Sequence, residues 1–169
     1  MKRTILLLLL STLSLLANPP WPGVAYTEVR AFAFDPKITK GKELIGEDLS
    51  LKAGVLNKAG VLLDAEQVKR LLAAQAARIQ RNLGIGCYLP HNLFVFYNAE
   101  KKPVAFLEIC FDCLGSRIHP PEEECAPDLV ALAKLCSELK LPFGKYKTFE
   151  AFQKRWGEEF SKKQAPAKS

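Results

Sequence analysis

This 169-residue sequence lacks several features that mark common protein classes. No apolar run reaches the roughly 20 residues that a membrane-spanning helix needs. No segment repeats at a period of roughly 20–50 residues, which excludes solenoids and propellers. Basic residues outnumber acidic ones by 24 to 18, but they form no cluster with aromatic or polar readers of bases. We therefore expect neither a membrane channel nor a nucleic-acid-binding protein.

Catalytic signatures are missing as well. We find no Ser-His-Asp set, no Gly-rich phosphate loop and no paired-carboxylate motif in a chain with only two histidines. This absence favours a non-catalytic protein and leaves thiol and metal chemistry as the alternatives. With 49% hydrophobic and 25% charged residues, the chain has the composition of a folded domain.

The first 17 residues have the pattern of a secretory signal peptide. Two basic residues precede an apolar stretch over residues 5–17, which ends at the small residue Ala17. We therefore expect residues 1–17 to be removed and the mature protein to be periplasmic or secreted, with no stable membrane span after cleavage. Because Leu15 lies where cleavage sites usually have a small residue, an uncleaved anchor is the alternative.

The rest of the chain predicts a single α+β domain over residues 18–161 and a disordered basic tail over residues 162–169. Alternating apolar residues over 24–34 predict a strand near a sheet edge. Apolar runs at 93–97 and 104–111, joined by a short polar turn, predict a β-hairpin that is buried on both faces. The expected fold is a small antiparallel sheet with this hairpin in its centre, packed against about three helices.

Helix starts are marked by residues that can cap free N–H groups. Asp64, with Gln67 three positions later, predicts a capping box at the start of one helix. Pro127 predicts the start of a second helix and Thr148 caps a third, whose aromatic stripe we interpret as core. Residues 36–63 carry several glycines between short apolar pieces and predict loops with one or two short strands.

Five cysteines lie in the C-terminal half of the chain. Export would place them in an oxidising compartment, where disulfides are the default expectation. The odd number leaves at least one thiol without a partner in the same chain. Cys136, on the apolar side of the helix that follows Pro127, is expected to be that buried thiol.

Strand pairing in the predicted hairpin gathers three cysteines at its open end. Opposed residues of an antiparallel hairpin have a constant sum of residue numbers, here about 199–201 for a tip near residue 100. This sum places Cys110 opposite residues 89–91 and Cys113 opposite residues 86–88. The predicted cluster therefore contains Cys87, His91, Cys110 and Cys113.

Three interpretations of this cluster remain open. The preferred one is a structural disulfide, Cys87–Cys113 or next Cys87–Cys110, because cross-strand neighbours have suitable spacing. The second is a zinc or copper site, since Cys87-x3-His91 and Cys110-x2-Cys113 would supply three thiolates and one imidazole. The third is a thioredoxin-like redox pair, which requires a helix after the first cysteine. Instead, a glycine and two prolines follow Cys113 and argue against a helix.

Glu108 interrupts the apolar run of the second hairpin strand. The same register places it opposite residues 91–93. A carboxylate in a buried strand must find a partner or stay protonated. We prefer a structural role, with Glu108 paired to an arginine, to His91 or to the backbone, over a role as general acid or base beside the thiols.

Four short motifs lie close together in this region: Cys87-Tyr88-Leu89-Pro90, Phe96-Tyr97, Lys102-Pro103-Val104-Ala105 and Ile109-Cys110-Phe111-Asp112-Cys113. Together they resemble a family of uncharacterised exported bacterial proteins, which has a Cys-x-x-Pro element and an Ile-Cys-Phe-Asp/Glu-Cys element in this order. The family has Arg-His after the proline, where this sequence has His91-Asn92. The resemblance implies that the hairpin and its cysteines form one unit, and it implies no activity, cofactor or partner.

These patterns predict an exported protein of the bacterial envelope. Its expected role is that of a non-catalytic, disulfide-stabilised module that binds an unknown protein or small ligand without a cofactor. The alternative is a thiol-redox or metal-binding protein that uses Cys87, Cys110 and Cys113, with zinc as the expected metal.

Overall fold

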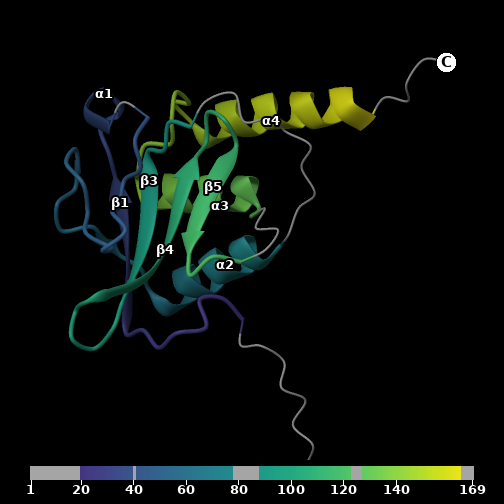
Figure 1. The fold of residues 1–169 in the computed structure, drawn as a ribbon. Helices are drawn as coiled ribbons and strands as arrows, with labels where there is room; N and C mark the ends of the chain where they lie inside the picture. Colours follow the sequence, from purple (N-terminus) through teal and green to yellow (C-terminus); the bar gives the residue numbers. More distant parts are fainter. Residues whose placement is uncertain (1–19, 40, 78–87, 123–126, 165–169) are drawn as a thin grey trace, which may run out of the picture.

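An antiparallel sheet with the strand order β2-β1-β3-β4-β5 organises the computed structural model (Figure 1). The structure describes residues 20–39, 41–77, 88–122 and 127–164. Its strands are β1 (Glu28–Ala33), β2 (Val61–Leu62), β3 (Asn92–Tyr97), β4 (Pro103–Cys110) and β5 (Gly115–His119). Its helices are α1 (Pro36–Thr39), α2 (Ala65–Ala76), α3 (Leu129–Glu138) and α4 (Phe149–Gln164). The predicted α+β class is therefore confirmed.

The predicted hairpin lies inside the sheet, as β3 and β4. Leu93 pairs with Glu108 and Asn92 with Ile109, so the residue numbers of each pair add to the upper end of the predicted range. A register shift between Phe96 and Tyr97 follows toward the tip. Both strands are buried along most of their length, because each side of the sheet is covered by another part of the chain.

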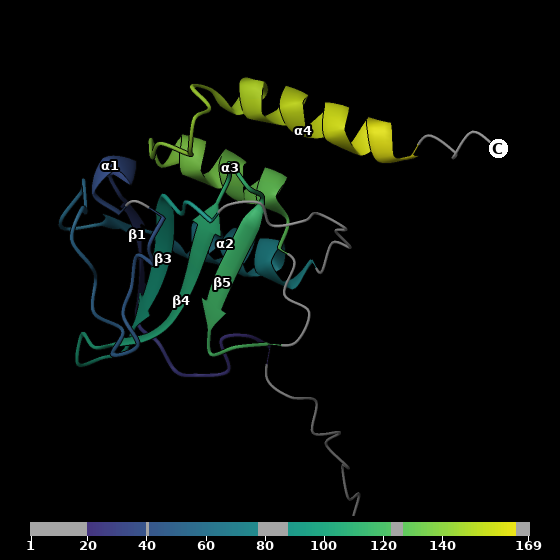
Figure 2. The same cartoon turned by 45° about the horizontal axis from the view of Figure 1, so that its top comes forward.

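Helices cover one face of the sheet. Figure 2 shows α2 and α3 against this face, with α4 running across one end of the layer. Asp64 and Gln67 form the predicted capping box, with N···O distances of 2.8 and 2.9 Å. The α3 helix begins two residues after Pro127, because Asp128 accepts the N–H groups of its first turn. Local sequence signals thus predicted the starts of α2, α3 and α4 to within two residues.

The opposite face is covered by residues 36–63, which contain only the single turn α1 and the short β2. Leu44 and Ile45 are fully buried against a cluster from β1, β3 and β4. Gly60 has φ +66°, and a Cβ there would lie 2.8 Å from the Phe32 ring, so the loop crosses the sheet where only glycine fits. The expected loops with short strands are confirmed, and they form a second core layer.

No helix follows Cys113, as the glycine and prolines indicated, but the chain forms a strand there that the sequence did not predict. Residues 115–119 form β5, which pairs with β4 from Cys110↔Gly115 to Phe106↔His119. This strand is largely polar, so it has no apolar alternation that would predict it. Because the chain turns at 111–114, Cys113 lies in that turn and does not extend the β3–β4 ladder toward residues 86–88.

Further expectations concern the ends of the chain. The α4 helix continues to Gln164, so the first residues of the expected tail are helical. The proposed signal segment, Cys87 and Cys125 lie outside the described residues. Among the helices of the described ranges, none combines the length and apolar character needed to cross a membrane.

Candidate functional site

Glu108 lies at the centre of a buried polar cluster on the loop-covered face. Its side chain is fully buried. One carboxylate oxygen accepts the backbone N–H of Leu44 at 2.7 Å and Arg117 Nη2 at 3.1 Å. The other accepts the Tyr88 hydroxyl at 2.8 Å. Glu108 therefore has the arginine and backbone partners that a structural role requires, and His91 is not among its described partners.

Arg117 connects this cluster to the covering loop. Its guanidinium donates to the backbone carbonyl of Ile45 at 3.1 Å and lies 3.2 Å from a carboxylate oxygen of Glu43. Burial, followed by the neighbouring Glu108 carboxylate, raises the pKa of Tyr88 well above its usual value. Tyr88 therefore remains a hydrogen-bond donor at neutral pH. The cluster holds residues 43–45 on the sheet through polar contacts that are satisfied within the chain.

The cysteine cluster is described only in part. Cys110, the last residue of β4, is fully buried, and Cys113 is half-buried in the following turn. The Cys110 sulfur accepts the backbone N–H groups of Leu89 at 3.4 Å and Cys113 at 3.3 Å. Burial raises the pKa of Cys110 to about 12, so this thiol stays protonated at neutral pH. Both preferred bridges require Cys87 and thus stay predictions.

None of the three described cysteines is bonded to another. Cys136 is buried on the inner side of α3, where the sequence predicted a buried thiol, and burial raises its pKa. The motif Cys110-x-x-Cys113 is followed by a turn and β5 and not by a helix. The helix dipole that activates thioredoxin-like cysteines is therefore not available to this pair.

The predicted metal ligands do not converge within the described ranges, where no three His, Cys, Asp or Glu side chains are placed to hold a metal ion. His91 is 6% exposed, and its Nδ1 has no hydrogen-bond partner among the described residues. Burial lowers the pKa of His91, while the charge of Asp112 acts in the opposite direction. His91 is therefore a neutral, buried imidazole, and the metal interpretation, which also requires Cys87, stays a prediction.

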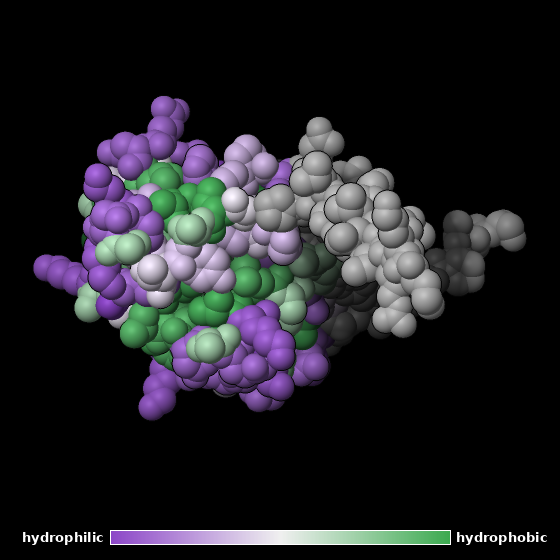
Figure 3. Space-filling model, turned by 90° about the horizontal axis from the view of Figure 1, so that it is seen from below, coloured by the Kyte–Doolittle hydropathy of each residue, from purple (hydrophilic) through white to green (hydrophobic). Residues whose placement is uncertain are grey.

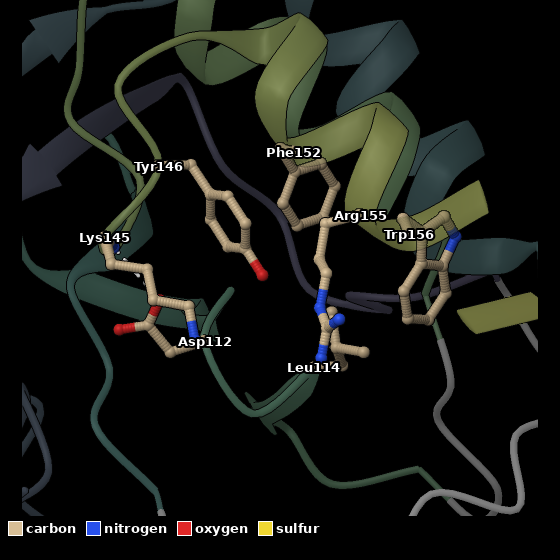
Figure 4. A pocket seen from close by; sticks show the side chains of 7 residues that line it. All are labelled: Asp112, Leu114, Lys145, Tyr146, Phe152, Arg155 and Trp156. Carbon is tan, nitrogen blue, oxygen red and sulfur yellow. Dashed lines mark hydrogen bonds between the residues drawn. The ribbon is translucent and has the colours of Figure 1, made fainter. Parts of the chain in front are cut away.

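A surface pocket between the β4–β5 turn and α4 was not predicted from the sequence. We call it the α4 pocket; it has a volume of about 150 Å³. Figure 4 shows Arg155 extending from α4 toward Leu114 of the turn, with aromatic side chains on both sides of it. The pocket is lined by Asp112, Leu114, Lys145, Tyr146, Phe152, Arg155 and Trp156.

The walls of the α4 pocket are aromatic. The rings of Tyr146 and Phe152 meet edge to face, with centroids 5.0 Å apart, and Trp156 stacks parallel to Phe152 at 6.4 Å. Phe152 and Trp156 belong to the stripe that we interpreted as core, and they are indeed buried. The same rings also form the pocket, because α4 covers the end of the layer and leaves one side of the stripe open.

One carboxylate attaches the turn to the segment before α4. Asp112 Oδ1 accepts the backbone N–H of Lys145 at 3.0 Å. Gly144 has φ +65°, and a Cβ there would lie 2.5 Å from the same oxygen, so only glycine allows this close approach. The sequence signal for the pocket was therefore Asp112 between two cysteines together with Gly144 before the last helix.

Other apolar surface is also exposed. Figure 3 shows one end of the molecule, where apolar surface is interrupted by polar side chains. The large apolar side chains that remain exposed come from different segments of the described chain: Val24, Ile38, Leu56, Leu62 and Leu89. Single exposed apolar residues are common on protein surfaces and do not by themselves define a site.

Comparisons with protein-family models, with curated proteins and with solved structures find no match. The functional conclusion therefore rests on the described residues and their chemistry.

Proposed function

We propose that the protein is a non-catalytic binding module that accepts an aromatic side chain of an acidic partner polypeptide in the α4 pocket. The observation that carries this proposal is the contrast between the pocket and the reactive residues. The pocket opens to solvent, whereas Glu108, Cys110 and His91 are buried. A group that acts on a substrate must reach it, so the open concave site is the better candidate for contact with another molecule.

The size of the pocket favours a single side chain as the occupant. Pockets that enclose drug-sized ligands have volumes of roughly 300–1,000 Å³. The α4 pocket, at about 150 Å³, has room for much less. Rings that are already arranged edge to face or stacked favour a further aromatic ring in the same geometry. A Phe or Tyr side chain presented by a partner therefore fits better than a cofactor.

Charge around the pocket favours acidic neighbours of that side chain. Lys145 and Arg155 line the pocket and are exposed, and the Lys145 ammonium lies 5.7 Å from the centre of the Tyr146 ring. The opposing carboxylate of Asp112 already accepts a backbone N–H. A partner with carboxylates beside its aromatic residue would meet two cations at the rim.

The direct test is a titration with the blocked tripeptide acetyl-Glu-Phe-Glu-amide, followed by the ¹H–¹⁵N resonance of the Trp156 indole. We expect a saturable shift of this resonance and none with acetyl-Glu-Ala-Glu-amide, because the pocket binds the ring. A Trp21→Phe variant assigns the indole signal, since the chain has only two tryptophans. Equal shifts with both peptides, or no shift at Trp156, would contradict the proposal.

A matched pair of variants tests the role of the rim charge. Arg155 lines the pocket, whereas its neighbour Lys154 is also exposed and is not among the lining residues. We expect Arg155→Glu to weaken binding of the acidic tripeptide at least several-fold and Lys154→Glu to change it less. Thermal unfolding of both variants serves as the control for retention of the fold. Equal losses of affinity in the two variants would show that the peptide is attracted only by the general positive charge of the surface, and would overturn the assignment of the pocket as the binding site.

We also propose that this module acts outside the cytoplasm, as a periplasmic or secreted protein. This part is supported by the basic start and apolar stretch of residues 1–17. The intact mass of the protein isolated from a bacterial expression host should correspond to a chain without these residues. A mass that includes residues 1–17 in exported material would contradict the proposed cleavage.

A further inference from the structure

Two thiols lie next to each other at the turn between β4 and β5. The backbone N–H of Cys113 points at the Cys110 sulfur at 3.3 Å, and the two residues are three positions apart across one turn. Neither thiol is bonded to another cysteine. The pairing differs from both predicted bridges, because it joins the two ends of one turn and does not involve Cys87.

The two thiols differ in their access to solvent. Cys110 is fully buried at the end of β4, where the Leu89 N–H also points at its sulfur. Cys113 is only half-buried. A reagent in solution therefore reaches Cys113 first. Burial raises the pKa of Cys110, so this thiol stays protonated until the oxidised Cys113 sulfur lies beside it as the target of attack.

We propose that Cys110 and Cys113 form a site of reversible oxidation, at which a small-molecule disulfide such as oxidised glutathione converts the two thiols to an intramolecular disulfide. The thiolate of Cys113 attacks one sulfur of oxidised glutathione. A mixed disulfide forms on Cys113 and one glutathione leaves as a thiolate, which takes up a proton.

Cys110 completes the reaction. Its sulfur attacks the Cys113 sulfur of the mixed disulfide, which forms the Cys110–Cys113 bond, breaks the bond to glutathione and releases the second glutathione, whose thiolate takes up the proton that Cys110 loses. The protein gives up two electrons and two protons, and oxidised glutathione becomes two molecules of glutathione. A glutathione thiol reverses both steps. The proposal rests on the two sulfurs and does not require the α4 pocket to bind anything, although Asp112 of the same turn lines that pocket.

Mass spectrometry of the full chain tests the proposal. Reduced protein is incubated with oxidised glutathione, the remaining thiols are alkylated, and the tryptic peptide that contains both cysteines is examined. We expect this peptide to be lighter by two hydrogens, to carry no alkyl group, and to gain two alkyl groups once it is reduced first. A glutathione that remains on Cys113, a bridge to Cys87, or two fully alkylated thiols would each overturn the proposal.

Single variants separate the two steps. In Cys110→Ser the attacking thiol is retained and the resolving thiol is absent, so a stable glutathione adduct should accumulate on Cys113. In Cys113→Ser the accessible thiol is absent, so Cys110 should react many-fold more slowly than Cys113 does in the unmodified chain. Cys136→Ala is the matched control, since Cys136 is buried in α3, and it should form the bridge at the unmodified rate.

Loss of the fold is checked separately. Thermal unfolding of each reduced variant shows whether the domain is intact. The order in which the mixed disulfide and the intramolecular bridge form is measured in the unmodified protein, so this test needs no variant. There, the mixed disulfide on Cys113 should appear before the bridge and decay as the bridge forms. A mixed disulfide that appears first on Cys110 would contradict the assigned roles.

Discussion

The two faces of the sheet are covered by different kinds of structure. On one face, which α2, α3 and α4 cover (Figure 2), apolar side chains of the helices pack against β3 and β4. The ion pair of Arg70 with Glu138 joins α2 to α3 and is partly exposed to solvent. On the other face, residues 36–63 cover a smaller apolar cluster with almost no regular structure. The helix-covered face therefore holds together mainly by apolar burial, with the contact of Gln75 and Glu122 as a buried polar exception.

The loop-covered face places polar contacts inside. An irregular segment satisfies only some of its backbone N–H and C=O groups internally, so other groups must satisfy the rest. Glu108 accepts from Leu44, Arg117 donates to Ile45, and the Asn57 amide bonds the backbone of β1 on both sides of Phe32. The comparison indicates that the sheet can use a loop as a second core layer because buried side chains replace the hydrogen bonds that a helix makes internally.

The largest effect is expected for removal of the buried carboxylate. Glu108→Ala leaves the Leu44 N–H and the Tyr88 hydroxyl without an acceptor and the Arg117 guanidinium without its buried partner. We expect the free energy of unfolding to fall by roughly 4 kcal/mol, as measured by urea denaturation.

The control for this change lies on the other face. Glu138→Ala removes an exposed carboxylate that makes two contacts with Arg70, at 2.6 and 3.0 Å. We expect a loss of at most about 1 kcal/mol, because solvent replaces the contact. Equal losses for Glu108→Ala and Glu138→Ala would show that the polar contacts inside the loop-covered face have no special importance.

A second pair of variants compares apolar packing on the two faces. Leu107 faces the helices and Leu93 faces the loop, and both side chains are fully buried in neighbouring strands. Truncation to alanine costs more where the surroundings cannot collapse into the cavity. We expect Leu107→Ala to cost about 3 kcal/mol and Leu93→Ala about 2 kcal/mol in urea denaturation. The reverse order would indicate that the loop is packed as rigidly as the helices.

A smaller effect is expected for two polar side chains that act on the backbone. Asn57→Ala removes two hydrogen bonds to β1, of 2.8 and 3.0 Å, and should cost about 1–2 kcal/mol. Asp64→Ala removes the exposed cap of α2 and should cost about 1 kcal/mol. Amide hydrogen exchange adds a regional test, because Asn57→Ala should speed exchange around residues 44–56 and Asp64→Ala in the first turn of α2.

The same difference between the faces decided what the sequence could predict. The capping box of Asp64 and the apolar runs of β3 and β4 are local patterns, and they predicted the helix, the hairpin and the number sum of its pairs. By contrast, β5 contains Ser116, Arg117 and His119 and is held by its pairing with β4. A strand that owes its stability to partners distant in sequence leaves no periodic signal.

The candidate site was predictable to a similar degree. Burial alone required a partner for Glu108, and the class of partner was correct. The individual partners of Glu108 could not be predicted, because Leu44 is 64 positions away from Glu108 in the sequence and Tyr88 precedes β3. The α4 pocket combines three segments, so only the fold brings Leu114 next to Arg155. The aromatic stripe of α4 predicted burial and could not predict that one side stays open.

The smallest expected effect concerns pH, at the end of the sheet where the two cover layers meet. The backbone carbonyl of His91 accepts the Phe34 N–H from the strand end beside the loop layer, and the neighbouring Asn92 amide donates to Pro142 before α4.

Burial lowers the pKa of His91 below its ordinary value near 6.5, and the charge of Asp112 offsets only part of this change. The unfolded chain therefore binds this proton more readily than the folded one. Stability should be fully present above about pH 6.5 and fall as the pH decreases toward the folded-state pKa. His91→Phe removes the titration, so its unfolding free energy should change less than that of the unmodified chain over the same interval. Parallel profiles for the two proteins, measured by urea denaturation at each pH, would show that His91 does not couple protonation to folding.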